Sequence, residues 1–357
     1  MRRVLVQRLR SAAVLAEDLV DGTGRVLLRR GQRLEPAALS RLARLGVSEL
    51  LIEDERLADL TLRPLLPPAG AAAVVAAVSA LYDRARAMGP RESRYIGWQG
   101  ELAEASQVLV EHVSVAPGPF ERVNVVAPDY LIGHALNVAL LAVLMARRRG
   151  IAASERLVMV AAGALVADLG MVHVPRAELE RPGPLSPAGL AAVRAHPERS
   201  FKALAASVPA LVKAIVLSHH QRWDGSGYPE GRGPGELHPM AELVGAVDVF
   251  LALCEDRPHR RALPPHEALE YMMSEAGRLF SADVIDALAR VANPYPTGVR
   301  VRLTSGEVGV VVRTGAVASR PVVRIIEDAS GRRTEPYDLD LGAPEAQTIF
   351  VAELLYD

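Results

Sequence analysis

Apolar residues recur every three or four positions through the middle of the chain, and this spacing is typical of helices packed on one face. The stretches that show it are 71–88, 98–112, 127–149, 153–168, 187–196, 201–207, 210–220, 241–254, 265–275 and 282–291. Few segments between them alternate as strands do. The pattern predicts one all-helical domain at residues 127–293, preceded by a linker and leading helices at residues 63–126.

At both ends of the chain the hydrophobic period changes to two. Val299, Val301 and Leu303 alternate with other residues, and valines recur at 308, 310 and 312, on either side of a Thr-Ser-Gly-Glu segment. This pattern predicts antiparallel strands in a small β module at residues 294–357. Residues 1–62 combine short alternating stretches, a hairpin-type Asp-Gly-Thr-Gly turn and one helical stretch. We therefore expect a mainly α protein, in which a helical bundle is flanked by a small α+β N-terminal module and a small β C-terminal module.

Composition narrows the location and the partners. The 357 residues carry a formal net charge of -1, so no strong field favours nucleic acid or an anionic membrane. Cys254 is the single cysteine, which excludes an internal disulfide. The longest apolar runs, at 71–81 and 157–167, are shorter than the roughly 18 to 20 residues of a membrane span. These features predict a cytoplasmic protein with no DNA and no membrane among its partners.

Two adjacent histidines mark the most distinctive stretch, residues 217–229. On a helix His219 and His220 would point about 100° apart, so they could serve two neighbouring metal centres, or one could ligate while the other carries a proton. The Gly-Ser-Gly-Tyr-Pro segment that follows cannot continue a helix. We expect a helix end that carries histidines and opens into a constrained loop at the mouth of a site.

Further side chains that can bind metal lie in the apolar helical block, and they are His134, Asp168, His196 and Asp248. Each has an ordinary explanation when taken alone: a satisfied helix histidine, a turn cap, a histidine at a helix end, or an arginine-paired aspartate. Burying an ionised aspartate is costly unless it is paired or coordinated. A set of imidazoles and carboxylates suits Fe, Mn or Zn with positions left for water.

The motifs around these residues resemble the HD-GYP domain, a branch of the HD superfamily of metal-dependent phosphohydrolases. The resemblance covers about residues 130–291. It rests on His134-Ala-Leu-Asn-Val, Ala164-Leu-Val-Ala-Asp-Leu-Gly, His196-Pro, His219-His-Gln-Arg-Trp-Asp-Gly-Ser-Gly-Tyr-Pro-Glu-Gly, Asp248-Val-Phe and Asp256-Arg-Pro. The Gly-Tyr-Pro segment is the most specific of these.

The resemblance implies hydrolysis of cyclic di-GMP, a bacterial second messenger, by two or three divalent ions, commonly iron or manganese. By motif, the metal ligands would be His134, Asp168, His196, His219, His220 and Asp248. Asp168, His219 and His220 would form the catalytic centre. The residues that shape the nucleotide pocket or contact its phosphates would be Gly227, Tyr228, Pro229, Arg257 and Arg260. The implied partner is cyclic di-GMP or a related nucleotide; a signalling protein and a second copy of the chain are left open.

The chain departs from the family pattern at four positions of the site. The histidine of the His-Asp pair is Ala167, and the usual lysine three residues after the aspartate is Met171. The usual second aspartate after Asp248 is Leu251, and Tyr130 replaces the acid of three-metal members. Since even the loss of a group behind a ligand typically costs about 10–100-fold in metal affinity or activity, we expect reduced or lost hydrolysis.

Two functions of different classes follow. The first is a cyclic di-GMP phosphodiesterase with a weakened metal centre. The alternative is a non-catalytic cyclic di-GMP sensor or protein-interaction module built on the HD-GYP scaffold. A third, weaker interpretation is an enzyme for another phosphate ester, because a fold by itself does not establish chemistry.

Overall fold

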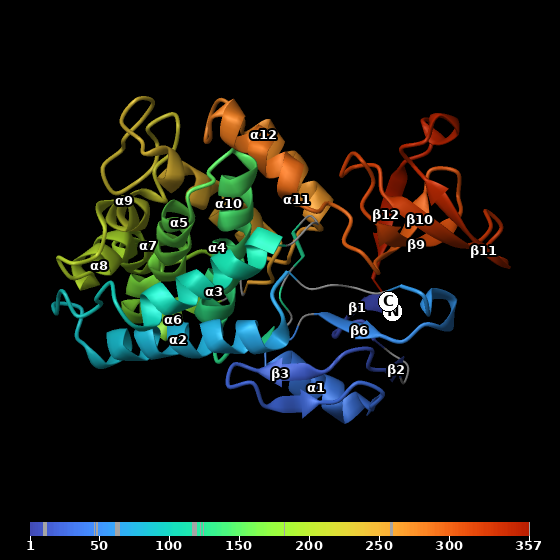
Figure 1. Cartoon of the computed structure of the whole chain (residues 1–357), viewed down its shortest axis with the longest axis horizontal. Helices are drawn as coiled ribbons and strands as arrows, with labels where there is room; N and C mark the ends of the chain where they lie inside the picture. The colour runs from blue at the N-terminus through green and yellow to red at the C-terminus, as the bar shows by residue number, and fades with distance from the viewer. Residues whose placement is uncertain are drawn as a thin grey trace.

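The computed structural model describes residues 1–9, 13–45, 47, 49–60, 65–115, 120–121, 123, 125–181, 183–257 and 260–356. Parts of the predicted segments 1–62 and 63–126 therefore lie outside the described residues. Figure 1 shows a helical domain on the left of the view, with a β-sheet module on the right and the N-terminal module below.

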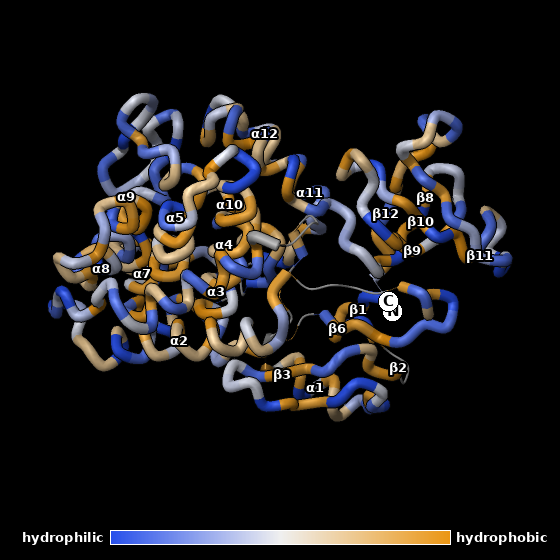
Figure 2. The backbone as a smooth tube through the Cα atoms, viewed as in Figure 1, coloured by the Kyte–Doolittle hydropathy of each residue, from blue (hydrophilic) through white to orange (hydrophobic). Residues whose placement is uncertain are grey.

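The central domain is helical, as expected. Its α-helices are α2 (Pro68–Ala87), α3 (Glu101–Val115), α4 (Tyr130–Arg148), α5 (Ser154–Val166), α6 (Arg176–Leu179), α7 (Pro187–Arg194), α8 (His196–Ala203), α9 (Ala210–Ser218), α10 (Pro239–Leu253), α11 (Pro265–Ser274) and α12 (Ala282–Val291), with a short 3-10 helix, η2 (Leu169–His173), after α5. One apolar core runs through all of them except the short α6 and α7, and α4 packs against both α5 and α10. Figure 2 shows the hydrophobic segments gathered inside this domain.

One predicted helix has different bounds. The stretch 201–207 was expected to be helical, but α8 begins at His196 and ends at Ala203. Pro197 sits in its first turn, where a missing N–H is not needed. Beyond Ala203 the chain leaves the helix because it pairs with the segment at Ile96, whose carbonyl accepts from the amide of Ala205 at 2.8 Å.

Two apolar segments do reach the length of a membrane span, contrary to the expectation from uninterrupted apolar runs. They are Tyr130–Arg148 and Ser154–His173. However, 78% and 67% of their most apolar windows are buried inside the protein. Their hydrophobicity is explained by their place in the core, since a helix that is apolar all round is typical of a buried one.

The N-terminal module is built from short paired strands and one helix. Its elements are β1 (Arg2–Leu5), β2 (Ala13–Val14), β3 (Leu19–Asp21), β4 (Val26–Leu28), β5 (Arg33–Leu34), α1 (Pro36–Arg44), β6 (Glu49–Ile52) and the 3-10 helix η1 (Glu55–Leu57). The antiparallel pairs are β1 with β6, β2 with β5 and β3 with β4. β7 (Val125–Val126), which precedes α4, pairs in parallel with β3 and so ties this module to the helical domain.

The C-terminal module is a five-stranded antiparallel sheet in the order β11-β10-β9-β8-β12. Its elements are β8 (Arg300–Leu303), β9 (Val308–Arg313), β10 (Val322–Glu327), β11 (Arg333–Asp340), the 3-10 helix η3 (Pro344–Ala346) and β12 (Val351–Leu355). Leu57 of the N-terminal module is buried against β9 and β10, and Arg324 of β10 pairs with Asp59. The predicted architecture, a mainly helical bundle with small flanking modules, is confirmed.

Candidate metal and nucleotide site

Three helix ends bring the central histidines and aspartate together. Asp168 directly follows α5 and its C-cap, His196 is the first residue of α8, and His219 and His220 follow α9. The turn after Asp168 is held by Ser200, whose hydroxyl accepts from the amide of Gly170 and donates to the carbonyl of Ala167, both at 2.7 Å. A tight turn between two buried elements therefore positions the aspartate.

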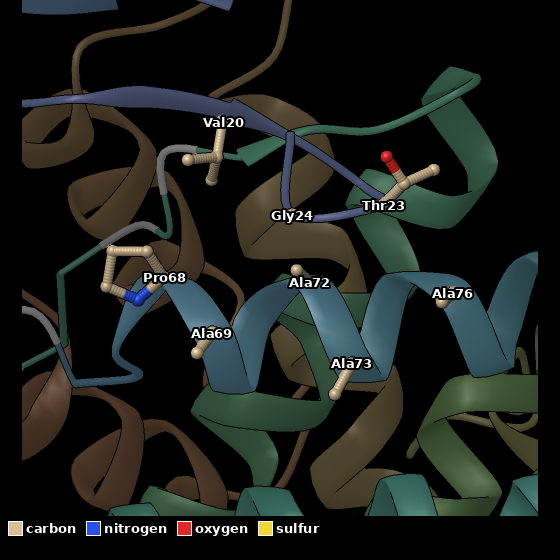
Figure 3. Close-up of a pocket in the computed structure, with 8 residues that line it drawn as sticks. All are labelled: Val20, Thr23, Gly24, Pro68, Ala69, Ala72, Ala73 and Ala76. Atoms are coloured by element: carbon tan, nitrogen blue, oxygen red, sulfur yellow. The ribbon is translucent and has the colours of Figure 1, made fainter. Parts of the chain in front are cut away.

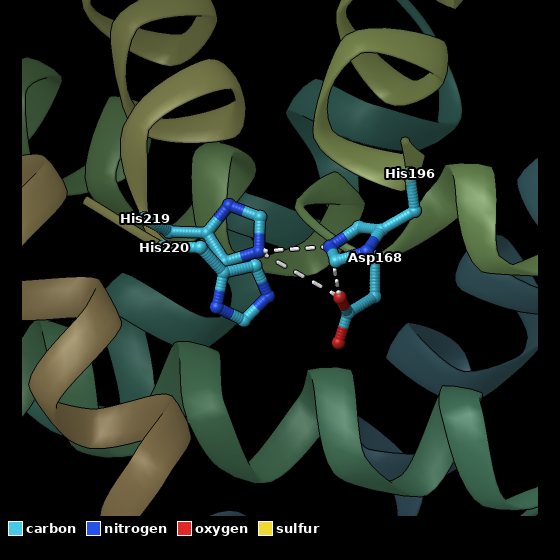
Figure 4. Close-up of side chains that lie close together, drawn as sticks. All are labelled: Asp168, His196, His219 and His220. Carbon is cyan, nitrogen blue, oxygen red and sulfur yellow. Dashed lines mark hydrogen bonds and ion pairs between the residues drawn. The ribbon is translucent and has the colours of Figure 1, made fainter. Parts of the chain in front are cut away.

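The first cluster, which we call the four-ligand group, consists of Asp168, His196, His219 and His220. One donor atom from each lies within 4.8 Å of the others. Asp168 Oδ1 is 3.0 Å from His196 Nε2 and 3.7 Å from His219 Nε2, and the two Nε2 atoms are 3.2 Å apart (Figure 4). His196 and His219 are only 1% exposed, so this convergence takes place in the protein interior.

The other ring nitrogens show which atoms of this group are available to a cation. His196 Nδ1 lies 2.6 Å from the carbonyl oxygen of Val193, and His219 Nδ1 lies 3.0 Å from that of Val216. A carbonyl oxygen can only accept, so each Nδ1 carries a proton, and the Nε2 of the neutral ring is a lone-pair donor. Two such nitrogens and a carboxylate oxygen facing one point are a donor set that fits a divalent transition metal.

A second cluster, the three-ligand group, consists of His134, Asp168 and Asp248, again with donor atoms within 4.8 Å of one another. His134 Nε2 is 2.8 Å from Asp248 Oδ1, and Asp248 Oδ2 lies 4.0 Å from His220 Nδ1. Asp168 belongs to both groups. The structure thus brings together all six side chains that the motifs predict as metal ligands, and their role as ligands stays a prediction.

The surroundings shift the protonation of three of these groups. Burial alone would raise the pKa of Asp168, but the close approach of the His196 and His219 rings outweighs burial and holds that pKa well below its usual value. Burial and the neighbouring histidines lower the pKa of His220 well below its ordinary value, so His220 is neutral. Burial would also lower the pKa of His134, but the carboxylates of Glu255 and Asp248 outweigh it and raise it to about 10.

The Gly-Tyr-Pro loop folds back over the end of α9. The Tyr228 amide donates to the carbonyl of His220 at 3.1 Å, and the Tyr228 ring stacks on the His220 ring with centroids 4.8 Å apart. A Cβ at Gly227 would lie 2.4 Å from the His220 carbonyl oxygen, so only glycine fits where the loop approaches the helix end. Pro229 follows through a cis peptide bond. The loop therefore forms one wall beside the four-ligand group.

The two predicted phosphate-binding arginines have different surroundings. Arg257 lies over the ring of Tyr130 and donates from Nη2 to its hydroxyl at 2.5 Å. Arg260 instead donates to the backbone carbonyls of Leu253, at 2.9 Å, and Ala252, at the end of α10. Arg257 therefore lies in a side-chain network that leads to His134, whereas the guanidinium of Arg260 caps a helix.

The comparisons with known proteins agree on the central domain. A family profile described as "HD domain" matches residues 120–284. This central part of the chain is therefore similar to HD domains. The prediction of an HD-type fold for the helical block is confirmed.

Several named proteins are similar to parts of this chain. A cyclic di-GMP phosphodiesterase of Pseudomonas aeruginosa is 32% identical over 71% of this chain and 62% of its own length. A cyclic di-GMP phosphodiesterase response regulator of Xanthomonas campestris is 37% identical over 34% of this chain and 33% of its own, and a 3'3'-cGAMP-specific phosphodiesterase of Vibrio cholerae is 33% identical over 47% and 36%. The chain thus spans less than two thirds of the length of these relatives.

A solved structure of an HDG"Y"P protein from Bdellovibrio bacteriovorus aligns with 80% of this chain and 97% of its own, at 17% identity and a TM-score of 0.48. This level of likeness says nothing about the site.

Three of the positions expected to depart from the family pattern have different surroundings. Ala167 caps the end of α5 and is buried, directly before Asp168. Leu251 is buried in the apolar core on α10, and Met171 lies half-buried in η2. The first cluster contains four potential ligands without residue 167, while the second contains three.

Two residues of the site were missed by sequence reasoning. Glu255 places Oε2 2.8 Å from His134 Nδ1, and Ser200 holds the turn at Asp168 as described above. Glu255 lies two residues beyond the end of α10, where helical spacing no longer applies, so no pattern in the sequence pointed to it. Ser200 left no signal either, because its contacts join segments about thirty residues apart.

A separate surface hollow lies between the β3–β4 turn and α2 (Figure 3). Its lining is formed by Val20, Thr23, Gly24, Pro68, Ala69, Ala72, Ala73 and Ala76. The Thr23 hydroxyl is the one polar side-chain group in that lining, so the hollow offers neither metal ligands nor a base. The two His-Asp clusters are therefore the candidate site.

Proposed function

We propose that this protein is a divalent-metal-dependent phosphodiesterase that hydrolyses a cyclic dinucleotide, cyclic di-GMP in the first instance, in a bacterial cytoplasm. The observation that carries the proposal is the convergence of His196 Nε2, His219 Nε2 and Asp168 Oδ1 in the interior. Two nitrogen lone pairs 3.2 Å apart repel each other unless a cation or a proton lies between them. The names of the relatives, which act on cyclic di-GMP and 3'3'-cGAMP, support the substrate class.

The residues fit a divalent ion by their chemistry. Imidazole and carboxylate donors suit Fe(II) and Mn(II), which we propose as the ions used here, and the neutral state of His220 leaves it able to ligate. A bound ion would lower the pKa of a water molecule and stabilise charge on phosphoryl oxygens. Asp168, as the residue shared by both groups, would hold the two positions at a fixed separation.

The rest of the site would orient the nucleotide. Tyr228, stacked on His220, presents an aromatic edge beside the four-ligand group, and Arg194 lies over its ring at 5.7 Å. Arg257 would exchange its bond to Tyr130 for a phosphate oxygen, since a guanidinium matches phosphate geometry with two donors. Arg260 is engaged by helix carbonyls, so we assign the larger role in phosphate binding to Arg257.

We propose that turnover is slow. Ala167 has no ligand atom at the position directly before Asp168, so the three-ligand group would bind its ion more weakly than the four-ligand group. Met171 supplies no cation for the phosphate or the leaving group. Both losses reduce stabilisation of the transition state more than they reduce binding of the nucleotide.

The test is a hydrolysis assay on the full chain. The protein is loaded with Mn(II), or with Fe(II) under anaerobic conditions, and incubated for hours with cyclic di-GMP and with 3'3'-cGAMP while the products are separated by chromatography. Linear dinucleotide that is absent from an Asp168→Asn control supports the proposal. If no product forms and calorimetry still shows nucleotide binding, the enzyme proposal is wrong and the sensor function takes its place.

A further inference from the structure

His134, His196 and His219 each point Nε2 into the ligand groups, but different acceptors hold their Nδ1 atoms. The Nδ1 acceptors of His196 and His219 are the carbonyls of Val193 and Val216. These carbonyls lie in the last turns of α7 and α9, where helix carbonyls have no partner within the helix. The backbone itself therefore sets the tautomer of these two rings.

His134 is oriented in a different way. It lies near the start of the nineteen-residue helix α4, and its Nδ1 faces a side chain and not a helix-end carbonyl. Its Nδ1 instead lies 2.8 Å from Glu255 Oε2. Its Nε2 faces a second carboxylate, Asp248 Oδ1, also at 2.8 Å. Because a carboxylate only accepts, Glu255 keeps a proton on Nδ1, so an ion bound beside Asp248 would replace the hydrogen at Nε2 and make Nε2 the ligand atom. A carboxylate behind a ligating histidine is a common arrangement in metal sites.

Glu255 is itself held in place. The hydroxyl of Tyr130 donates to Glu255 Oε2 at 2.8 Å, and Arg257 Nη2 donates to that hydroxyl at 2.5 Å. The side chains of His134 and Glu255 are 2% and 13% exposed. A carboxylate so little exposed is costly unless it is paired, and here it accepts from two donors at once. These contacts hold Glu255 Oε2 between the Tyr130 hydroxyl and His134 Nδ1.

We propose that Glu255 is the positioning residue of His134: it accepts a hydrogen bond from Nδ1 and turns Nε2 toward Asp248 and Asp168. The three-ligand group can then hold a second divalent ion without a histidine at residue 167. This inference rests on the proposed function, because it concerns the same metal site. It goes further because it makes binding of the second ion depend on Glu255, a carboxylate that is not among the six predicted ligands.

The test measures metal binding and the His134 tautomer in the full chain. Calorimetric titration with Mn(II) should give two binding events for the wild type. Glu255→Leu should weaken the second event by about 10–100-fold and leave the first unchanged. Glu255→Gln should weaken it less, because the amide oxygen still accepts from Nδ1. Glu270→Leu, which removes an exposed carboxylate of α11, is the matched control and should change neither event.

Nitrogen-15 NMR of the Zn(II)-loaded protein gives a readout that a purely structural role would not move. The His134 ring should show a protonated Nδ1 and a metal-bound Nε2 in the wild type, and Glu255→Leu should lose this signature. Circular dichroism checks that the variant is folded. If it is not, the nitrogen-15 spectrum of the wild type alone shows whether His134 carries its proton on Nδ1.

The outcomes separate the two proposals. A wild type that binds one ion only, a proton found on Nε2 of His134, or a leucine variant with unchanged second-site affinity overturns the role of Glu255 and leaves the proposed function in place. A wild type that binds no ion overturns both.

Discussion

The two ligand groups share Asp168 but differ in what supports them. In the four-ligand group the histidines His196 and His219 are oriented by main-chain carbonyls at helix ends. In the three-ligand group His134 depends on a side chain, Glu255, that is itself held by Tyr130. Backbone orientation persists as long as the helices do, whereas side-chain orientation can be lost through one substitution. The comparison predicts a robust metal position next to a fragile one.

The largest effect is expected where the two groups meet. Asp168→Asn replaces the shared carboxylate by an amide that carries no charge, so both positions should lose affinity for Mn(II), by at least about 100-fold. Elemental analysis after dialysis against Mn(II) measures this. Asp283→Asn, an exposed aspartate at the start of α12, should retain the wild-type metal content. Equal metal content in the Asp168 and Asp283 variants would remove Asp168 from the site.

A second pair of variants separates the groups. His196→Ala should abolish the tighter of the two Mn(II) binding events, since it takes one of the two converging Nε2 donors from the four-ligand group. His134→Ala should abolish the weaker event and leave the tighter one in place, because His134 does not belong to the four-ligand group. If His134→Ala abolished the tighter event instead, the three-ligand group would be the one with the higher affinity for Mn(II).

Ala167→His sharpens the comparison by adding a donor beside Asp168. We expect about tenfold tighter binding of the second Mn(II) and faster hydrolysis of cyclic di-GMP, because the added imidazole supplies a ligand atom that alanine lacks. Metal content and initial rates measure this. Ala167→Asn fills part of the same buried space without an imidazole and serves as the control. No gain over Ala167→Asn would mean that the weakness of this group has another cause.

The smallest effects are expected from the arginines. Arg257→Ala should weaken nucleotide binding by about tenfold, because a hydrogen bond to a charged group contributes about 1.5–3 kcal/mol. Arg260→Ala should leave nucleotide affinity nearly unchanged and lower the free energy of unfolding by about 1 kcal/mol, since its guanidinium serves carbonyls at the end of α10. Calorimetry and thermal unfolding of both variants measure the difference. Equal losses of nucleotide affinity would contradict the division of roles between these two residues.

The architecture was largely predictable from hydrophobic spacing. Helices α4, α5 and α10 carry apolar residues at helical intervals, and the apolar residues of β8 alternate with arginines. β9 was less clear, because it is apolar and buried along nearly its whole length. The bounds of α8 were not predictable, because the pairing of residues 204–205 with Ile96 joins segments about a hundred residues apart. Local spacing carries no information about such a partner.

The site shows the same division. The sequence alone determined which side chains could bind metal, because ligand chemistry belongs to residue types and their motifs, and His134, Asp168 and His219 could be named from it. Only the tertiary structure decided how they are oriented: helix-end carbonyls behind His196 and His219, and Glu255 behind His134. The contacts behind His196 and His219 are local, three residues back, but they form only where a helix ends. The contact of Glu255 with His134 joins segments more than a hundred residues apart, and only packing sets its distance of about 3 Å.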